Sequence, residues 1–407
     1  MFDPLKLKKD FPILSREVNG KSLIYLDSGA TSQKPEIVLK AEKEYYEQHN
    51  ANVHRGAHAL GDEATQLYAE ARELVAKFIG AKAEEIIFVR NTTEAINLVA
   101  YSWGMDNLKK DDVIMTTIME HHANLVPWQE LSRRTGAKVE VVGITEDGLL
   151  DMDDFQQKLK LKPKMVAIVH VSNALGTINP VSQMTKMAHK VGSIVLVDGA
   201  QAVPHMKVDV NEIGCDFYAF SGHKMLGPMG IGVLWGRKSI LTEMSPFLTG
   251  GGMISEVYLD HSRWAELPDK FEAGTPNVAG AVGLMGAVKY LENIGMDSVV
   301  KHDQEIVNYA LKKLSDVSCL RVLGFKESRL RSGSVSFEYQ GVHAHDVATI
   351  LDSEGVAIRS GHHCTMPLHN HLGVSASVRA SFNVYTTKTD IDALVGALDK
   401  VKKIFKK

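Results

Sequence analysis

Seven apolar segments of strand length recur along the first two thirds of the chain, and this feature most constrains the fold. They cover residues 84–89, 112–118, 138–144, 165–171, 193–198, 216–221 and 231–235. Their hydrophobicity is continuous rather than alternating, which is typical of strands that are buried on both faces. Segments with helical patterns separate them. The alternation of strands and helices predicts an α/β fold with a mainly parallel seven-stranded sheet covered by helices on both sides.

The pattern changes after about residue 280. Two helical segments (280–295 and 302–316), a few strands and a C-terminal amphipathic helix (390–407) predict a smaller α+β domain. At 407 residues the chain exceeds the size at which single cores usually split into domains. We therefore expect an N-terminal segment (1–20), a large domain (21–280) and a small C-terminal domain (281–407). The Gly-rich stretch 249–264 is expected to be a mobile connection between them.

Charge and cysteine content exclude several classes of protein. The net charge of −3 gives no electrostatic argument for binding nucleic acid or a membrane surface. The first residues lack the apolar core and cleavage site of a signal peptide. Three widely spaced cysteines, an odd number, argue against a disulfide framework and favour a reducing cytoplasm. Cys215 and Cys319 follow apolar or strand-like patterns, so we expect both in the core.

Residues able to do chemistry follow the predicted strands, where ligands bind in open α/β sheets. They are Thr92 and Thr93, His121 and His122, Asn173, Asp198 and Gln201, and Ser221, His223 and Lys224. Each has an ordinary explanation: the threonines can cap a helix, and SGHK can be a turn that contains a lysine. The ordered set, with each member at a strand end, favours a binding site.

One ligand explains this set. A carboxylate such as Asp198, at the end of an apolar strand, is costly to bury without a cationic partner. Hydroxyls at a helix N-terminus bind phosphate. Pyridoxal 5′-phosphate combines a phosphate, a protonated ring nitrogen that pairs with an Asp, and an imine to a lysine, here Lys224. The sequence therefore predicts a pyridoxal-phosphate site.

Longer motifs carry a resemblance to a known family. FSGHKMLGP, VDGAQAV, MEHHANLVPW, HVSNALGTINP, FEAGTPN and RSGHHCTMP resemble those of class V, fold-type-I pyridoxal-phosphate enzymes. The chain is most similar to the cysteine desulfurases of the SufS type, also called group II or selenocysteine lyase-like. The resemblance covers nearly the whole chain and implies the fold-type-I transferase architecture. Gly29, Thr365 and Thr386 depart from the family pattern.

The resemblance implies a role for each site residue. Lys224 would bind the cofactor covalently and move the substrate's α-proton, Asp198 would pair with the ring nitrogen, and Gln201 would bond the ring hydroxyl. His121 would stack on the ring and assist proton transfer, although the residues alone do not decide between it and His122. The phosphate would be held by Thr93, Ser221, His223 and, from the other subunit of a homodimer, Thr275. The substrate carboxylate would be bound by Asn173, Arg379 and Arg359.

Cys364, in the loop RSGHHCTMP, is the predicted nucleophile. A reactive cysteine needs a high thiolate fraction, and we expect His362, His363 and Arg359 to supply a positive setting. The resemblance implies that L-cysteine is converted to L-alanine with a persulfide on Cys364. An acceptor protein of SufE or SufU type would then receive the sulfur for iron–sulfur cluster assembly. Selenocysteine is a second expected substrate.

Two other interpretations remain open. Another class V enzyme, such as an aminotransferase or a kynureninase-like hydrolase, would share Lys224 and Asp198 but would not need Cys364. A metal- or cluster-binding carrier would make the lysine incidental. HAH, residues 343–345, would put two rings on one face of a strand, but no CxxC pair accompanies the histidines, and we expect no intrinsic metal site. We hypothesise instead that His343 or His345 contacts the sulfur acceptor.

Overall fold

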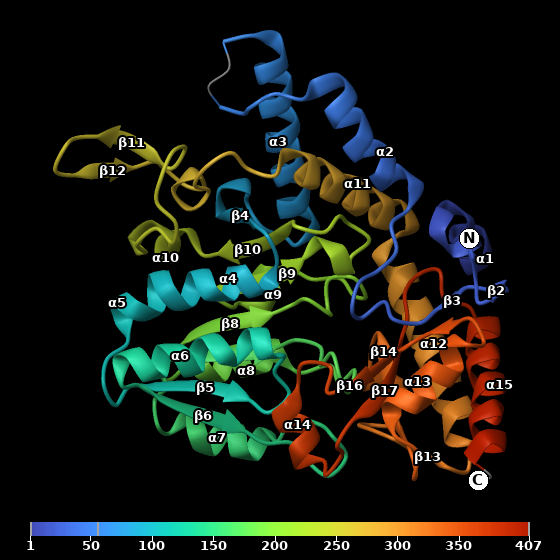
Figure 1. Ribbon diagram of the computed structural model, residues 1–407. Helices are drawn as coiled ribbons and strands as arrows, with labels where there is room; N and C mark the ends of the chain where they lie inside the picture. The colour runs from blue at the N-terminus through green and yellow to red at the C-terminus, as the bar shows by residue number, and fades with distance from the viewer. Residues whose placement is uncertain (1, 55–56, 406–407) are drawn as a thin grey trace.

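The computed structural model describes residues 2–54 and 57–405, which form a large and a small sheet flanked by helices (Figure 1). The large sheet consists of β4 (Ile86–Val89), β5 (Val113–Thr117), β6 (Lys138–Val142), β7 (Met165–Val169), β8 (Ile194–Asp198), β9 (Phe217–Ser221) and β10 (Gly232–Gly236), in the spatial order β4–β10–β9–β8–β7–β5–β6. Strands β5 to β9 run parallel to one another, and β10 is antiparallel to β4 and β9. The predicted mainly parallel seven-stranded sheet is confirmed.

The direction of β10 follows from its connection to β9. Parallel neighbours need a crossover of a dozen or more residues, usually a helix. Between Ser221 and Gly232 the chain makes only the short 3₁₀ turn η7 (Gly222–Lys224) and then returns. Because this connection is too short for a crossover helix, β10 runs back along β9, and Lys224 stays at the carboxyl end of β9.

Helices bury both faces of the large sheet. The helices are α1 (Pro4–Leu7), α2 (Glu36–Glu44), α3 (Ala59–Phe78), α4 (Thr92–Leu98), α5 (Met105–Asn107), α6 (Val126–Thr135), α7 (Met152–Leu159), α8 (Val181–His189), α9 (Val210–Ile213), α10 (Lys238–Glu243), α11 (Val278–Ile294), α12 (Met296–Ser315), α13 (Ala344–Asp352), α14 (Met366–His371) and α15 (Lys388–Phe405). Among these helices of the described residues, none combines the length and apolar character needed to cross a membrane.

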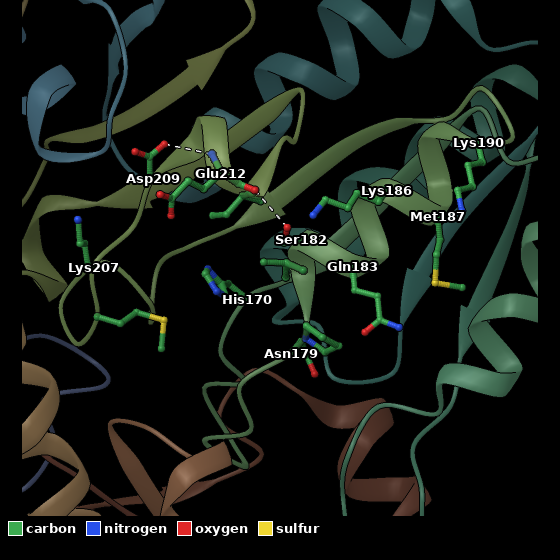
Figure 2. Close-up of a pocket in the computed structure, with 14 residues that line it drawn as sticks. His170, Asn179, Ser182, Gln183, Lys186, Met187, Lys190, Lys207, Asp209 and Glu212 are labelled. Carbon is green, nitrogen blue, oxygen red and sulfur yellow. Dashed lines mark hydrogen bonds between the residues drawn. The ribbon is translucent and has the colours of Figure 1, made fainter.

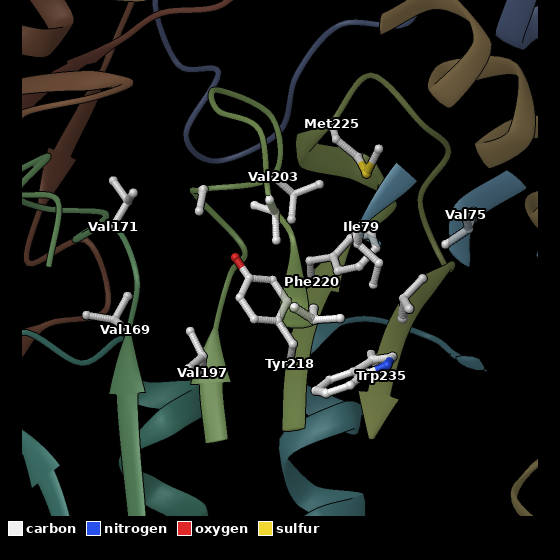
Figure 3. Packing of buried hydrophobic residues seen from close by; sticks show 14 of the residues in the cluster. Val75, Ile79, Val169, Val171, Val197, Val203, Tyr218, Phe220, Met225 and Trp235 are labelled. Carbon is white, nitrogen blue, oxygen red and sulfur yellow. The ribbon is translucent and has the colours of Figure 1, made fainter. Parts of the chain in front are cut away.

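Strand β9 is apolar along its whole length because both of its faces are buried. Tyr218 and Phe220 pack in one apolar cluster with Val75 of helix α3 and with Ile79, which directly follows that helix, as Figure 3 shows. The alternate residues of the same strand pack in a second cluster, with helices α4 and α6, on the opposite face. Every β9 side chain is therefore buried, as the continuous pattern predicted.

The small sheet lies beside the large one and comes from the C-terminal part of the chain (Figure 1). Its antiparallel strands are β13 (Leu320–Val322), β14 (Ser334–Tyr339), β17 (Ser377–Ser381) and β16 (Arg359–Gly361), in that spatial order. Helices α12, α13 and α15 share an apolar cluster with it. In addition, β3 (Ile24–Tyr25) pairs in parallel with β15 (Val356–Ala357), so an early segment joins this half of the molecule. The domain boundaries expected at residues 20 and 280 stay a prediction.

The stretch 249–264 is ordered differently from our expectation. Instead of a plain connection it contains a β-hairpin of β11 (Ile254–Val257) and β12 (Ser262–Trp264), which projects from the body in Figure 1. Four residues before the turn and three after it, with Ile254, Val257 and Trp264 among them, have enough β-branched and aromatic character to pair, despite the glycines before them. Leu259 at its tip is fully exposed.

The small-sheet cluster should contribute measurably to stability. Phe337 on β14 is completely buried, so Phe337→Ala should cost about 3–5 kcal/mol through lost transfer energy and a cavity. The exposed Phe405→Ala on α15 should change stability by no more than about 0.5 kcal/mol. The midpoints of urea unfolding measure both effects, and equal midpoints for the two variants would contradict this account of the core.

Candidate active site

The predicted site residues converge on a pocket at the carboxyl ends of the parallel strands. Its volume is about 200 Å³. The lining residues include Thr93, His121, Asn173, Asp198, Ser221, His223, Lys224, Arg359, Cys364 and Arg379, together with Gly29, Ala30, Asn91, Thr92, Ala123, Ala200 and His363. Two predicted residues are not among them. Gln201 directly follows the lining residue Ala200 and donates from Nε2 to the Gly29 carbonyl at 2.8 Å. Thr275 is exposed and outside the pocket.

Lys224 and Asp198 form the electrostatic centre of the pocket. Asp198 is the last residue of β8, and Lys224 ends the turn η7 after the neighbouring strand β9. Burial lowers the pKa of Lys224, while Asp198 raises it. Burial likewise raises the pKa of Asp198, which Lys224 and the Ala200 N–H at 2.9 Å oppose. A lysine with a lowered pKa holds more of its amine in the neutral, nucleophilic form.

His121 presents a neutral imidazole to the pocket. Its Nδ1 accepts the backbone N–H of Ala123 at 3.0 Å, so the ring proton is on Nε2. Burial, with Lys224 and other nearby cations, lowers the pKa of His121 to about 3. The ring is therefore uncharged at neutral pH and can stack on an aromatic ligand or exchange a proton through Nε2.

A buried carboxyl group fixes the turn that carries His121. One Glu120 oxygen accepts from Thr117 Oγ1 at 2.7 Å and from the Val169 N–H at 2.9 Å. The other accepts from Asn124 Nδ2 at 2.6 Å. Burial nevertheless raises the pKa of Glu120 to about 8, and the nearby Asp198 charge adds to this. A protonated Glu120 adds no negative charge beside Asp198.

Hydroxyl groups lie at the end of the pocket where helix α4 begins. Ser221 Oγ lies 2.6 Å from Thr92 Oγ1 and accepts the Thr92 N–H at 2.9 Å. Asn91 caps the helix, and Thr93 is exposed beside it. Burial and nearby lysines lower the pKa of His223 to about 4. Hydroxyls and backbone N–H groups at a helix start suit a phosphate group.

Two arginines face each other across β16 and β17. Arg359 and Arg379 are direct partners in the strand register, and Asp27 lies between them. Its carboxylate oxygens are 3.2 Å from Arg379 Nη2 and 3.5 Å from Arg359 Nε. Sequence reasoning missed Asp27, although an acidic residue directly after the apolar run LIYL was a usable signal. Without this carboxylate the two like charges would repel each other across the strands.

Buried polar atoms around Arg379 lack partners. Arg379 donates from Nη1 to the Asn173 carbonyl at 3.0 Å, but its Nε and the Asn173 Oδ1 have no hydrogen-bond partner among the described residues. Buried polar atoms are normally satisfied. The carboxylate of an α-amino acid would accept a hydrogen bond from Arg379 Nε, and its amino group would donate one to Asn173 Oδ1.

The Cys364 loop lies at the mouth of the pocket. Cys364 is exposed, Cys215 is buried as expected and Cys319 is only partly buried. Lys224 and Arg379, whose pKa values burial lowers, both lie close enough to Cys364 to interact with it electrostatically. The expectation that His363 adds positive charge is wrong. Its ring is buried and near Arg379, which lowers its pKa to about 2, so it is neutral.

The site fits pyridoxal 5′-phosphate on three structural grounds. Asp198 is only 3% exposed, and within residues 2–54 and 57–405 it forms no ion pair. A buried carboxylate in this state needs a cation, which a protonated pyridine nitrogen supplies. A lysine with a lowered pKa lies near it, and the hydroxyl cluster stands where a phosphate would be bound.

Two other features do not contribute to the pocket. His343 and His345 are exposed at the start of helix α13, where His343 Nδ1 accepts the His345 N–H, so the strand predicted for them is wrong. A polar loop residue followed by AHDVATILD is a helix start that we overlooked. Figure 2 shows a wider groove of about 880 Å³, lined by Lys186 and Lys207 among others, which contains none of the predicted site residues.

Comparisons with known proteins show which family the chain resembles over its length. The chain matches the aminotransferase class-V family over residues 24–394. It is 53% identical to a probable cysteine desulfurase of Halalkalibacterium halodurans, with 98% of each chain covered. The structure is similar to the apo cysteine desulfurase of Thermococcus onnurineus (TM-score 0.95, 42% identity, 99% of each chain covered). It is also similar to the S-sulfonic acid form of cysteine desulfurase CsdA from Escherichia coli (TM-score 0.91, 38% identity, 99% of each chain covered).

The raised pKa of Glu120 predicts a pH-dependent stability. The unfolded carboxyl ionises near pH 4.5 and the folded one near pH 8, so this contribution to stability is complete below about 4.5 and is lost as the pH rises through about 8. Glu120→Gln should therefore gain stability relative to wild type between pH 5 and pH 9. Urea midpoints at both pH values measure this, with the exposed Glu146→Gln as control. An equal difference at both values would mean that folded Glu120 stays ionised.

Proposed function

The chain belongs to the class-V aminotransferase family as a cysteine desulfurase, and from this we propose that Cys364 carries the sulfur of L-cysteine as a persulfide to an acceptor protein. The cofactor is pyridoxal 5′-phosphate. The observation that carries the proposal is the convergence of Lys224, Asp198 and Cys364 on one pocket. Another class V reaction would have no use for the exposed thiol at its mouth.

The residues divide the work of holding the cofactor. Lys224 would attach it covalently, Asp198 would keep its ring nitrogen protonated, and His121 would stack on its ring. Thr93, Ser221 and His223 would hold the phosphate, and Gln201, whose Nε2 donates to the Gly29 carbonyl, would bond the ring hydroxyl. Pyridoxal 5′-phosphate supplies a ring that accepts electrons from the α-carbon of an amino acid.

The substrate is held by its carboxylate. Arg379 uses its free Nε–H, Asn173 its amide, and Arg359 closes the site from the exposed side. A guanidinium binds a carboxylate in a fixed geometry, which orients the substrate sulfur toward Cys364. Lys224 removes the proton from the substrate α-carbon, which its lowered pKa favours.

Sulfur transfer is a displacement at the substrate sulfur. The Cys364 thiolate bonds to that sulfur while the C–S bond breaks, and the electron pair of the C–S bond stays with the carbon. A proton completes the methyl group, so L-cysteine and the Cys364 thiol become L-alanine and a Cys364 persulfide. His121, with its proton on Nε2, assists the proton transfers.

The exposed position of Cys364 supports delivery of the sulfur to another protein. We propose that this acceptor is of the SufE or SufU type, that the sulfur serves iron–sulfur cluster assembly, and that the enzyme acts in the cytoplasm. The exposed Thr275, outside the pocket of its own chain, supports a homodimer in which it reaches the other subunit's phosphate. Selenocysteine fits the same carboxylate-binding residues.

The first test compares alanine release from L-cysteine by wild type and Cys364→Ala, in the presence of cofactor and reductant. Wild type should form alanine, and Cys364→Ala should keep the yellow cofactor but form none, because no thiol attacks the sulfur. Cys319→Ala, a cysteine away from the pocket, is the matched control and should stay active. Equal activity of Cys364→Ala and wild type would sink the proposed nucleophile.

The role of Lys224 is tested by the covalent attachment of the cofactor. Borohydride treatment of wild type should add the cofactor's mass to the Lys224 peptide. Lys224→Ala should show no such adduct and should lose activity by on the order of 10²- to 10⁴-fold, since the group that moves the α-proton is gone. A reducible adduct on another lysine of the variant would assign the attachment elsewhere.

A further inference from the structure

The backbone around Cys364 is in an unfavourable conformation. His363 and Cys364 have φ angles of 51° and 58°, in the left-handed region, and neither is a glycine. Side chains disfavour this region because Cβ approaches the backbone. Such a conformation persists only where surrounding contacts fix it. The contacts that hold this loop therefore decide where the Cys364 sulfur lies.

Three hydrogen bonds hold the loop from the large-sheet side. Asn173 Nδ2 donates to the His363 carbonyl at 2.6 Å. The other two involve His122: its backbone N–H donates to the Cys364 carbonyl at 2.8 Å, and its ring Nε2 accepts the Met366 N–H at 3.1 Å. His122 is therefore hydrogen-bonded to the residues on both sides of Thr365.

The bond from Met366 also completes a helix start. Met366 is the first residue of α14, which lies against the loop after β5 although it is far along the chain (Figure 1). The first N–H groups of a helix lack partners within it, and Thr365 before α14 provides no side-chain cap. The His122 ring provides it instead.

We propose that His122 is a positioning residue that holds Cys364 in place for attack on the substrate sulfur. This rests on the proposed function of Cys364. His122 does not line the pocket, whereas His121 does, so the two adjacent histidines serve different parts of the site. Holding a nucleophile in its attacking position affects the chemical step, while the substrate is bound by other residues.

The protonation state of His122 agrees with this role. Nε2 can accept the Met366 N–H only when it carries no proton. Burial lowers the pKa of His122, and the neighbouring His362 lowers it further. The acceptor form is therefore the favoured one at neutral pH.

Two substitutions separate the ring contact from the mere presence of a polar side chain. His122→Gln places an amide oxygen near the position of Nε2 and should keep the bond to Met366. His122→Asn has the same chemical group but is shorter, reaches only the Nδ1 position and should lose the bond. His371→Ala removes an exposed histidine of α14 and serves as a control. Both amide variants keep the backbone bond to Cys364, which guards against loss of folding.

The measurements are kcat and KM for L-cysteine and hydrogen exchange of the Met366 amide in the holoenzyme. For His122→Asn we expect faster exchange at Met366 and a kcat lower by on the order of 10- to 100-fold, with KM within about twofold of wild type. His122→Gln and His371→Ala should resemble wild type in all three.

Three results would overturn the proposal. Unchanged exchange in His122→Asn would mean that the ring does not hold Met366, and unchanged kcat would mean that the hold has no catalytic value. Equal losses in the Asn and Gln variants would mean that the acceptor position is irrelevant. Failure of the proposed function is distinguishable, because wild type would then form no alanine, whereas faster Met366 exchange in His122→Asn alone would still establish the contact.

Discussion

The Asp198 carboxylate, which is buried at the end of β8 and forms no ion pair among the described residues, is the constraint around which the site is organised. A charge in that position is costly, and the protein reduces the cost in two ways that cooperate. Burial raises the pKa of Asp198, and the nearby Lys224 opposes that rise. The second buried carboxyl group of the region, Glu120, has a pKa of about 8, so near neutral pH it adds little negative charge beside Asp198. A protonated ring nitrogen of the cofactor would supply the positive charge that the buried Asp198 carboxylate still needs.

In the Cys364 loop, hydrogen bonds from other parts of the chain offset an unfavourable backbone conformation. His363 and Cys364 adopt left-handed backbone angles that nothing in their own side chains favours. Hydrogen bonds from Asn173 and His122, which belong to the large-sheet half, hold them there. Cys364, the proposed nucleophile, is on the small-sheet half, so the same bonds also join the two halves at the mouth of the pocket.

The sequence predicted what depends on local pattern and failed where distant contacts decide. Seven continuous apolar runs became seven strands, because burial on both faces leaves a clear mark on composition. Lys224 and Asp198 reached one pocket, because strand ends of a parallel sheet meet at one edge. Cys364 reached the same pocket from the small sheet, where its loop follows β16. The antiparallel direction of β10, however, depends on the length of a connection. The bridging role of Asp27 depends on a register between segments 352 residues apart, and the neutral state of His363 depends on burial.

The pairing of β3 with β15 has a consequence for how the chain is made. Residues 24–25 find their partners only at 356–357, and the carboxylate of Asp27 meets its arginines only after β16 and β17 exist. During synthesis the large sheet can form from contiguous segments. Residues 24–25 stay unpaired until nearly the whole chain has been synthesised, because their partners are residues 356–357. The end of the pocket that contains Asp27, Arg359 and Arg379 therefore requires the C-terminal strands, so a nascent or truncated chain can form the large sheet and still lack this part of the site.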